Sequence, residues 1–223
     1  MDLMPHRMLP RIRKAVAIPA RIAARLQGWG QRILASLQAP RLRRAVAAHP
    51  RLHLGCGYKI LADWVNVDSE ERVAQVVPWD LTLPMPLTAD TISHVYSEHF
   101  IEHLPRADVV KLLADCHRCL KPGGVLRLST PDLAQVVESY RTQRLDAWIA
   151  VGWQPATPCQ MVNEALSAWG HRFLFDEAEL LDVLRATGFR EVRRVAWGQS
   201  EHVPLRGIET RPACGDLIVE AIK

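Results

Sequence analysis

Residues 51–68, RLHLGCGYKILADWVNVD, decide the fold of this chain. A short apolar run meets the turn Gly55-Cys56-Gly57, and a second apolar run ends on the acid Asp68. Glycine in such a turn permits positive φ and lets a ligand lie against the main chain. Asp68 can accept hydrogen bonds from both hydroxyls of a ribose. The stretch therefore predicts two strands joined by a glycine turn, the beginning of a nucleoside-binding site.

The spacing after the turn argues against a dinucleotide site. That fingerprint needs a third glycine and an acid about 20 residues on, whereas Asp68 comes much earlier and Tyr58, Lys59 and Ile60 replace the glycine. The two strands leave room for little more than a turn of helix, so we do not expect a pyrophosphate on a long helix N-terminus. A ligand with a ribose but no phosphate fits better, and S-adenosylmethionine is the common one.

Three further motifs follow the glycine turn in order, and together they resemble class I S-adenosylmethionine-dependent methyltransferases. Residues 79–81, WDL, are similar to the family segment whose acid contacts the adenine amine. Residues 97–104, SEHFIEHL, are similar to its Glu-His-x-x-Glu-His-Leu signature. Residues 120–124, LKPGG, resemble its turn into the fifth strand. The resemblance runs from about residue 51 to the C-terminus.

The resemblance implies an α/β fold, with a doubly wound, Rossmann-like seven-stranded sheet and a shortened first helix. It also implies an enzyme that uses S-adenosylmethionine as cofactor. The cofactor-binding residues that it implies are Gly55, Cys56, Gly57, Asp68, Asp80, Leu81, Ser97 and Glu98.

A branch of small bacterial methyltransferases is especially similar, because its members also shorten the first helix. That branch often accompanies sugar-transferring and cell-envelope enzymes, so we expect O-methylation of a sugar or another envelope intermediate, with a small-molecule or saccharide acceptor. Residues 207–211, GIETR, also resemble this branch, although the sequence gives no role for Glu209.

Length and composition agree with one catalytic domain and an appendage. The chain has 223 residues, 48% of them hydrophobic, which is enough for a single sizeable core. Five cysteines without regular spacing predict a reducing, cytoplasmic compartment, and no apolar run approaches the ~20 residues of a membrane span. We therefore expect an extension over residues 1–50 and a methyltransferase domain over 51–223.

The N-terminal extension is strongly basic. Residues 1–51 hold eleven Arg or Lys and one acid, within a chain of net charge +4. Apolar residues at helical spacing predict an amphipathic helix over residues 20–38, between Pro19 and Pro40. The stripe consists of Ile18, Ile22, Leu26, Trp29, Ile33 and Leu37. This helix either lies on an anionic membrane surface or packs on the enzyme as a lid or dimer contact. A mitochondrial presequence is disfavoured, because Ser36 is its only hydroxyl residue.

Residues 132–175 are longer than a strand-to-helix connection requires, so they are expected to form an insertion over the pocket and to set specificity. Within them, residues 133–148 are predicted to be helical and residues 151–171 irregular. His99, just past the fourth strand, and His171, at the end of the insertion, are the candidates for a general base. The alternative for His99 is packing beside the cofactor and capping the following helix.

No metal site is predicted. His99 and His103 stand at i and i+4, and Cys116, His117 and Cys119 cluster further on, but zinc needs three or four ligands at defined spacings. Cys116 and Cys119 share a helix face with leucines, which favours a buried apolar role.

Two other functions compete with methyl transfer to a small acceptor. A non-catalytic nucleoside-binding or scaffold module could keep the same fold and use the helix to recruit partners. A nucleic-acid methyltransferase is disfavoured, because the basic charges lie outside the catalytic domain and no base-flipping motif is present.

Overall fold

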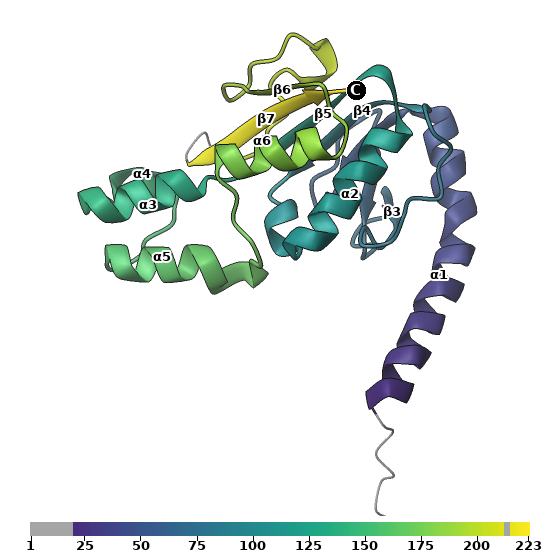
Figure 1. Cartoon of the computed structure of the whole chain (residues 1–223), viewed down its shortest axis with the longest axis horizontal. Helices are drawn as coiled ribbons and strands as arrows, with labels where there is room; N and C mark the ends of the chain where they lie inside the picture. Colours follow the sequence, from purple (N-terminus) through teal and green to yellow (C-terminus); the bar gives the residue numbers. More distant parts are fainter. Residues whose placement is uncertain (1–19, 212–214) are drawn as a thin grey trace, which may run out of the picture. The chain divides into compact units, whose positions relative to one another are not determined.

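The computed structural model describes residues 20–211 and 215–223 (Figure 1). It divides the chain into two compact units, residues 1–37 and 38–223. Ile18 and Pro19 of the predicted amphipathic segment lie outside the described residues, as do the side chains of residues 20–29, 31 and 32.

A seven-stranded sheet forms the centre of the second unit, in the order β3-β2-β1-β4-β5-β7-β6. The first five strands pair in parallel, and β7 runs antiparallel to both of its neighbours. The strands are β1 (Arg51–Leu54), β2 (Val65–Asp68), β3 (Val76–Pro78), β4 (Ile92–Glu98), β5 (Leu120–Pro131), β6 (Glu191–Arg194) and β7 (Asp216–Ile222). The predicted doubly wound, seven-stranded fold is confirmed.

The connection from β1 to β2 contains turns in place of a helix. The side chain of buried Asn66 on β2 forms hydrogen bonds with the backbone of this connection. Its oxygen accepts from Leu61 N at 2.9 Å, and its amide nitrogen donates to the carbonyls of Leu61 and Trp64. Because one side chain bonds these backbone groups, the chain can return to the sheet without a long helix.

Two helices, α2 (Arg106–Cys119) and α6 (Glu177–Ala186), contact each other and pack against the strands (Figure 1). Cys116 and Cys119 of α2 are buried with reduced side chains, which confirms the predicted apolar role. Elsewhere, the segment before β7 packs on the sheet, where Leu205, in η3 (Val203–Leu205), and Ile208 join a core cluster with Tyr96.

The insertion is more helical than predicted. The expected helix over 133–148 is divided into α3 (Leu133–Thr142) and α4 (Asp146–Ala150), because Gln143 takes a left-handed φ of 57°. The expectation of irregular chain over 151–171 is wrong: α5 (Pro158–Ser167) and η2 (Ala168–Gly170) lie there. Trp148 and Met161 are buried in the small core that these helices share.

The N-terminal helix α1 (Ala20–Ala48) confirms the predicted helix but not its end at Pro40, which lies inside it. Leu42 and Val46 are buried, and the Arg41 guanidinium donates to Glu71 and to the carbonyl of Val76. This packing compensates for the backbone hydrogen bond that proline removes. Among the described residues, no helix is both long enough and apolar enough to cross a membrane.

Candidate functional site

The glycine turn lies at the carboxyl end of β1 and is held from β2. Gly55 and Gly57 both have positive φ, 66° and 53°, as the sequence predicts. Gly55 N donates to Val67 O at 2.9 Å, and Gly57 N donates to Asp68 Oδ2 at 2.9 Å. The acid at the end of β2 therefore fixes the turn.

Asp68 keeps room for a further ligand. Its Oδ1 also accepts from Ser69 Oγ and Glu70 N, both at 3.3 Å, and its side chain is partly exposed. A carboxylate offers about four lone-pair sites, so one remains for a hydroxyl, whereas the sequence predicted that Asp68 accepts from both ribose hydroxyls.

The two glycines meet different surroundings. A Cβ on Gly55 would lie 2.2 Å from the Phe100 ring, so a side chain there has no space. A Cβ on Gly57 would meet nothing within 4 Å, so an open cradle borders the backbone beside Asp68. The turn is therefore packed on the Phe100 side and open to a ligand on the other.

The other predicted cofactor-binding residues have internal partners. Asp80 accepts from Thr82, and Leu81 is buried. Ser97 donates to Leu54 O at 3.1 Å, which joins β4 to β1.

Glu98 anchors a distant segment of the chain. Its carboxylate accepts from Thr210 N at 2.9 Å, Thr210 Oγ1 at 2.6 Å and Arg211 N at 3.1 Å. Glu98 therefore holds the residues 207–211 that follow η3 against the end of β4.

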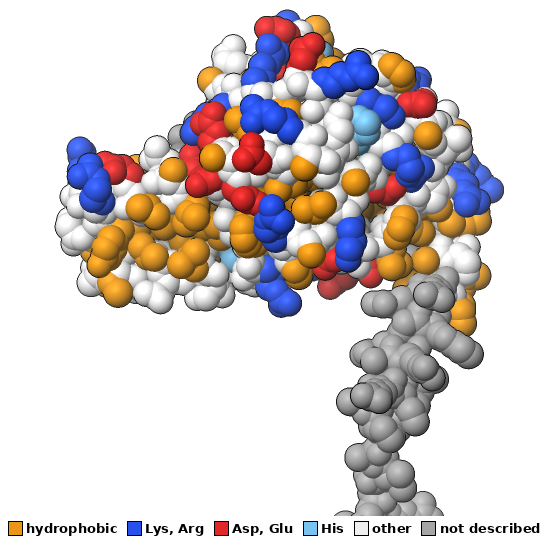
Figure 2. Space-filling model, in the orientation of Figure 1, with side chains coloured by type: hydrophobic (Ala, Val, Ile, Leu, Met, Phe, Trp, Pro, Cys, Tyr) orange, Lys and Arg blue, Asp and Glu red, His pale blue; other side chains and the backbone are white. Residues whose placement is uncertain are grey.

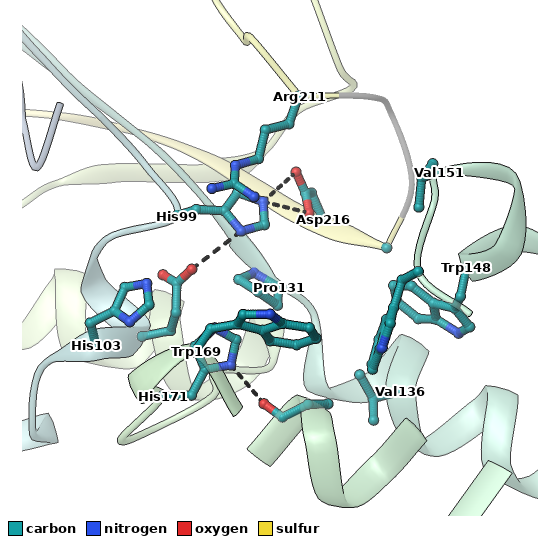
Figure 3. Close-up of a pocket in the computed structure, with 14 residues that line it drawn as sticks. His99, His103, Pro131, Val136, Trp148, Val151, Trp169, His171, Arg211 and Asp216 are labelled. Carbon is teal, nitrogen blue, oxygen red and sulfur yellow. Dashed lines mark hydrogen bonds and ion pairs between the residues drawn. The ribbon is translucent and has the colours of Figure 1, made fainter. Parts of the chain in front are cut away.

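A cavity of about 350 Å³ lies between the end of β4 and the insertion. Figure 3 shows the histidines and Asp216 at one end of it, with Trp148, Val136 and Val151 at the other. Three tryptophans line it, and their rings meet edge to face: Trp148 with Trp153 at 5.4 Å, and Trp153 with Trp169 at 5.2 Å between centroids. The cavity thus has an aromatic wall and a polar end.

At the polar end, His99 stands between two carboxylates. Its Nε2 is 3.1 Å from both oxygens of Asp216, and its Nδ1 is 3.3 Å from Glu102 Oε1. Burial alone would lower the pKa of His99, but hydrogen bonds and charges from Asp216 and Glu102 outweigh it and raise this pKa to about 9. His99 therefore carries a proton at neutral pH, with both ring nitrogens engaged.

His171 has one engaged and one available nitrogen. Its Nδ1 lies 2.7 Å from the carbonyl oxygen of Ala165, so Nδ1 carries the hydrogen and Nε2 a lone pair. Among the described residues, nothing hydrogen-bonds to Nε2. The turn through Trp169 and Gly170, both at positive φ, directs His171 into the cavity.

Comparisons with known proteins identify the family. A family model described as a methyltransferase domain matches residues 27–193. The chain belongs to this methyltransferase-domain family. A search of curated proteins returns no match.

Two solved structures share the fold. One is a SAM-dependent methyltransferase from Archaeoglobus fulgidus, 18% identical, with a TM-score of 0.51 over 85% of this chain and 94% of that one. The other is a SAM-dependent methyltransferase from Thermotoga maritima, titled a possible histamine N-methyltransferase, 19% identical, with a TM-score of 0.51 over 91% and 97%.

The chain is a class I S-adenosylmethionine-dependent methyltransferase. Its own geometry fits that cofactor. The open cradle at Gly57 and the Asp68 carboxylate, which can accept a further hydrogen bond, lie together at the carboxyl ends of β1 and β2. Because Ser97 of β4 pairs with Leu54 of β1, the end of β4 and the His99 that follows it lie beside the carboxyl end of β1. The individual cofactor-binding and catalytic residues stay predictions.

Sequence reasoning missed two features of the site. Glu102, His103 and His171 lie together, whereas the sequence predicted no metal site and gave no reason to group these three residues. Glu209, which had no role, binds buried Arg127 of β5, 2.7 Å from Nε. A signal for the second was present, because an arginine inside the apolar strand VLRLS needs a buried acid partner.

Proposed function

We propose that this methyltransferase transfers a methyl group to a hydroxyl oxygen of a saccharide or another cell-envelope intermediate. The observation that carries the proposal is the cavity beside the end of β4, with a tryptophan wall and a polar end. Sugar rings present C–H faces that pack on indole rings and hydroxyls that need polar partners. A cavity with both features suits such an acceptor.

The surface of the insertion supports an acceptor with an apolar part. Figure 2 shows hydrophobic side chains gathered over α3 and α5. The exposed ones in the insertion include Val137, Tyr140 and Leu166. Contiguous apolar patches of this kind mark interaction sites, and a lipid-linked sugar would bring such an apolar part.

Bound S-adenosylmethionine supplies an electrophilic methyl group on its sulfonium. The chain's own contribution is to position the acceptor and remove its proton. His171 Nε2 is the candidate proton acceptor, because its lone pair faces the cavity while both nitrogens of His99 are engaged. His99 and Asp216 form the polar end that orients the acceptor hydroxyls.

The proposal is tested with labelled S-adenosylmethionine and a set of envelope saccharides, followed by mass spectrometry of the methylated product. His171→Ala should lower turnover by about 10² to 10⁴ and leave cofactor affinity nearly unchanged, as loss of a general base would. Trp169→Ala should raise the acceptor KM, whereas Val203→Ala, at an exposed position outside both the cavity and the insertion, should not. Transfer to nitrogen acceptors alone would contradict the proposal.

We also propose that residues 20–38 attach the enzyme to an anionic membrane surface. The support is the apolar stripe of this segment and its flanking Arg21, Arg25 and Arg32, each worth about 1 kcal/mol near such a surface. Flotation with anionic liposomes should carry the full chain at low salt and less of it as salt rises.

The truncated control should start at Gln38, because Ala39, Leu42 and Val46 are buried in the second unit. A start at Ala48 would remove that packing. The protein from residue 38 onward should bind cofactor and stay unbound to liposomes. Equal flotation of the two proteins would place the membrane contact elsewhere, and no flotation of either would leave the helix as a lid or dimer contact.

A further inference from the structure

Three side chains with metal-ligating atoms converge at the polar end of the cavity: Glu102, His103 and His171. Their ligand atoms all lie within 4.8 Å of one another. Glu102 and His103 end the short helix η1 (Ile101–His103), and His171 follows η2 at the far end of the insertion. The cluster is assembled by the fold from two distant segments.

The backbone fixes the two segments against each other. The carbonyl of Glu102 accepts from Arg172 N at 2.7 Å and from Phe173 N at 3.2 Å, immediately beside His171. The rings of His103 and His171 meet edge to face with centroids 5.0 Å apart. The three side chains therefore converge through main-chain pairing and do not depend on flexible surface loops.

Hydrogen bonds to neighbouring residues orient the possible ligand atoms of His171 and Glu102. Since His171 Nδ1 donates to the carbonyl of Ala165, its Nε2 presents a lone pair, the orientation found in histidines that bind metals. Glu102 is fully buried; its Oε2 accepts from Thr130 Oγ1 at 3.1 Å. Its Oε1 lies 3.3 Å from His99 Nδ1, so each carboxylate oxygen has one polar neighbour and keeps a further lone pair. A buried carboxylate with unused acceptor capacity thus adjoins two histidines.

We propose that Glu102, His103 and His171 bind a divalent transition-metal ion, with zinc the best match. Two imidazoles and one carboxylate form the ligand set of catalytic zinc sites that keep a position open for water or substrate. Tetrahedral zinc holds ligand atoms roughly 3.4 Å apart, so small side-chain rotations close the cluster around an ion. The open position would face the cavity that these residues line.

This inference rests on the proposed function for its chemical purpose. A metal ion held by these three residues would coordinate the acceptor hydroxyl at its open position and lower the pKa of the O–H, so the proton would leave to solvent water. The oxygen then forms its bond to the methyl carbon as the carbon–sulfur bond of the cofactor breaks. In this state His171 Nε2 is a ligand, and the metal takes over the activation assigned above to a free histidine.

Metal content of the full-length chain, prepared without an affinity tag, tests the site directly. The protein is stripped with a chelator, loaded with Zn²⁺, passed through gel filtration and measured by mass spectrometry of the metal; Co²⁺ loading adds an absorption spectrum. One ion per chain should be retained. His103→Ala and His171→Ala should lose it, and Glu102→Gln should weaken binding by at least about tenfold.

His49→Ala serves as the matched control, since His49 is exposed and outside the cluster. His171→Gln provides a second variant should His171→Ala unfold, because its amide can still donate toward Ala165. Failure of the wild-type chain to retain Zn²⁺ or Co²⁺ would overturn the site. Undiminished retention by both histidine variants would overturn this ligand set.

Methyl transfer is measured separately on the same preparations. Zinc bound at this cluster in a protein that methylates no hydroxyl acceptor would support the site and reject the proposed function. An enzyme that retains no zinc after chelation and still methylates saccharides at an undiminished rate would support the proposed function and reject the metal site.

Discussion

Replacing Arg127 should lower the free energy of unfolding more than a substitution at an exposed position, because Arg127 neutralises two buried acids. Its side chain is fully buried in the middle of β5. Nε lies 2.7 Å from Glu209 Oε1, Nη1 lies 2.7 Å from Glu220 Oε1, and Nη2 also pairs with Glu209. Nη1 donates further to the carbonyl of Gln199 at 2.9 Å. Arg127→Met would leave these acceptors without their partner.

The magnitude follows from the burial of the acids. Breaking a buried ion pair by removing one partner costs about 3–5 kcal/mol, because an uncompensated charge stays buried. Both acid side chains are only 1% exposed, and Arg193 approaches Glu220 Oε2 no closer than 3.6 Å. We therefore expect the upper part of that range. At about 2–4 °C per kcal/mol for a domain of this size, the Tm should fall by roughly 10–20 °C.

Urea unfolding followed by tryptophan fluorescence measures the loss. Arg185→Met is the matched control: it breaks the exposed pair with Asp182, so its cost should stay below about 1 kcal/mol. Adding Glu209→Gln and Glu220→Gln to Arg127→Met should recover much of the stability, because no buried charge is then unpaired. A single Arg127→Met variant as stable as the control would refute the reasoning.

Two predictions concern the cofactor. Asp68→Ala removes a charge-assisted acceptor, worth about 1.5–3 kcal/mol, so calorimetric affinity for S-adenosylmethionine should fall at least about tenfold. Unchanged affinity in a folded variant would remove Asp68 from the site. Gly57→Val should abolish cofactor binding in a domain that still folds, because φ is 53° and the side chain would fill the open cradle; normal binding by this variant would place the pocket elsewhere.

The fold was predictable from the sequence wherever local signals were decisive. The glycine turn and the acid at the end of β2 each depend on a few adjacent residues, whereas the doubly wound sheet was predicted from the resemblance to a known family. The end of α1 could not be predicted in this way. Local rules end a helix at Pro40, but α1 continues past it because Leu42 and Val46 are buried. The start of α5 was misread for another reason: Pro158 breaks a helix interior but suits a first turn, with Thr157 as the N-cap.

The site was predictable only in part, because its polar end is assembled across the chain. His99 and His171 could be singled out by residue type and position. Their environments could not, since Asp216 reaches His99 from the last strand and Glu102 meets His171 through backbone pairing. Only the packed insertion shows that His171 has Nε2 available while His99 has neither nitrogen free.

The residues from Glu209 to Arg211 connect the stability of the sheet with the shape of the cavity. Arg127 holds Glu209 on β5, and Glu98 holds Thr210 and the Arg211 backbone at the end of β4. Arg211 then lines the cavity, as His99 does (Figure 3). A buried ion pair seldom adds net stability over apolar packing, so its value here is the fixed position that it gives this segment. Glu209, the acid without an assignable role in the sequence, thereby positions one wall of the cavity.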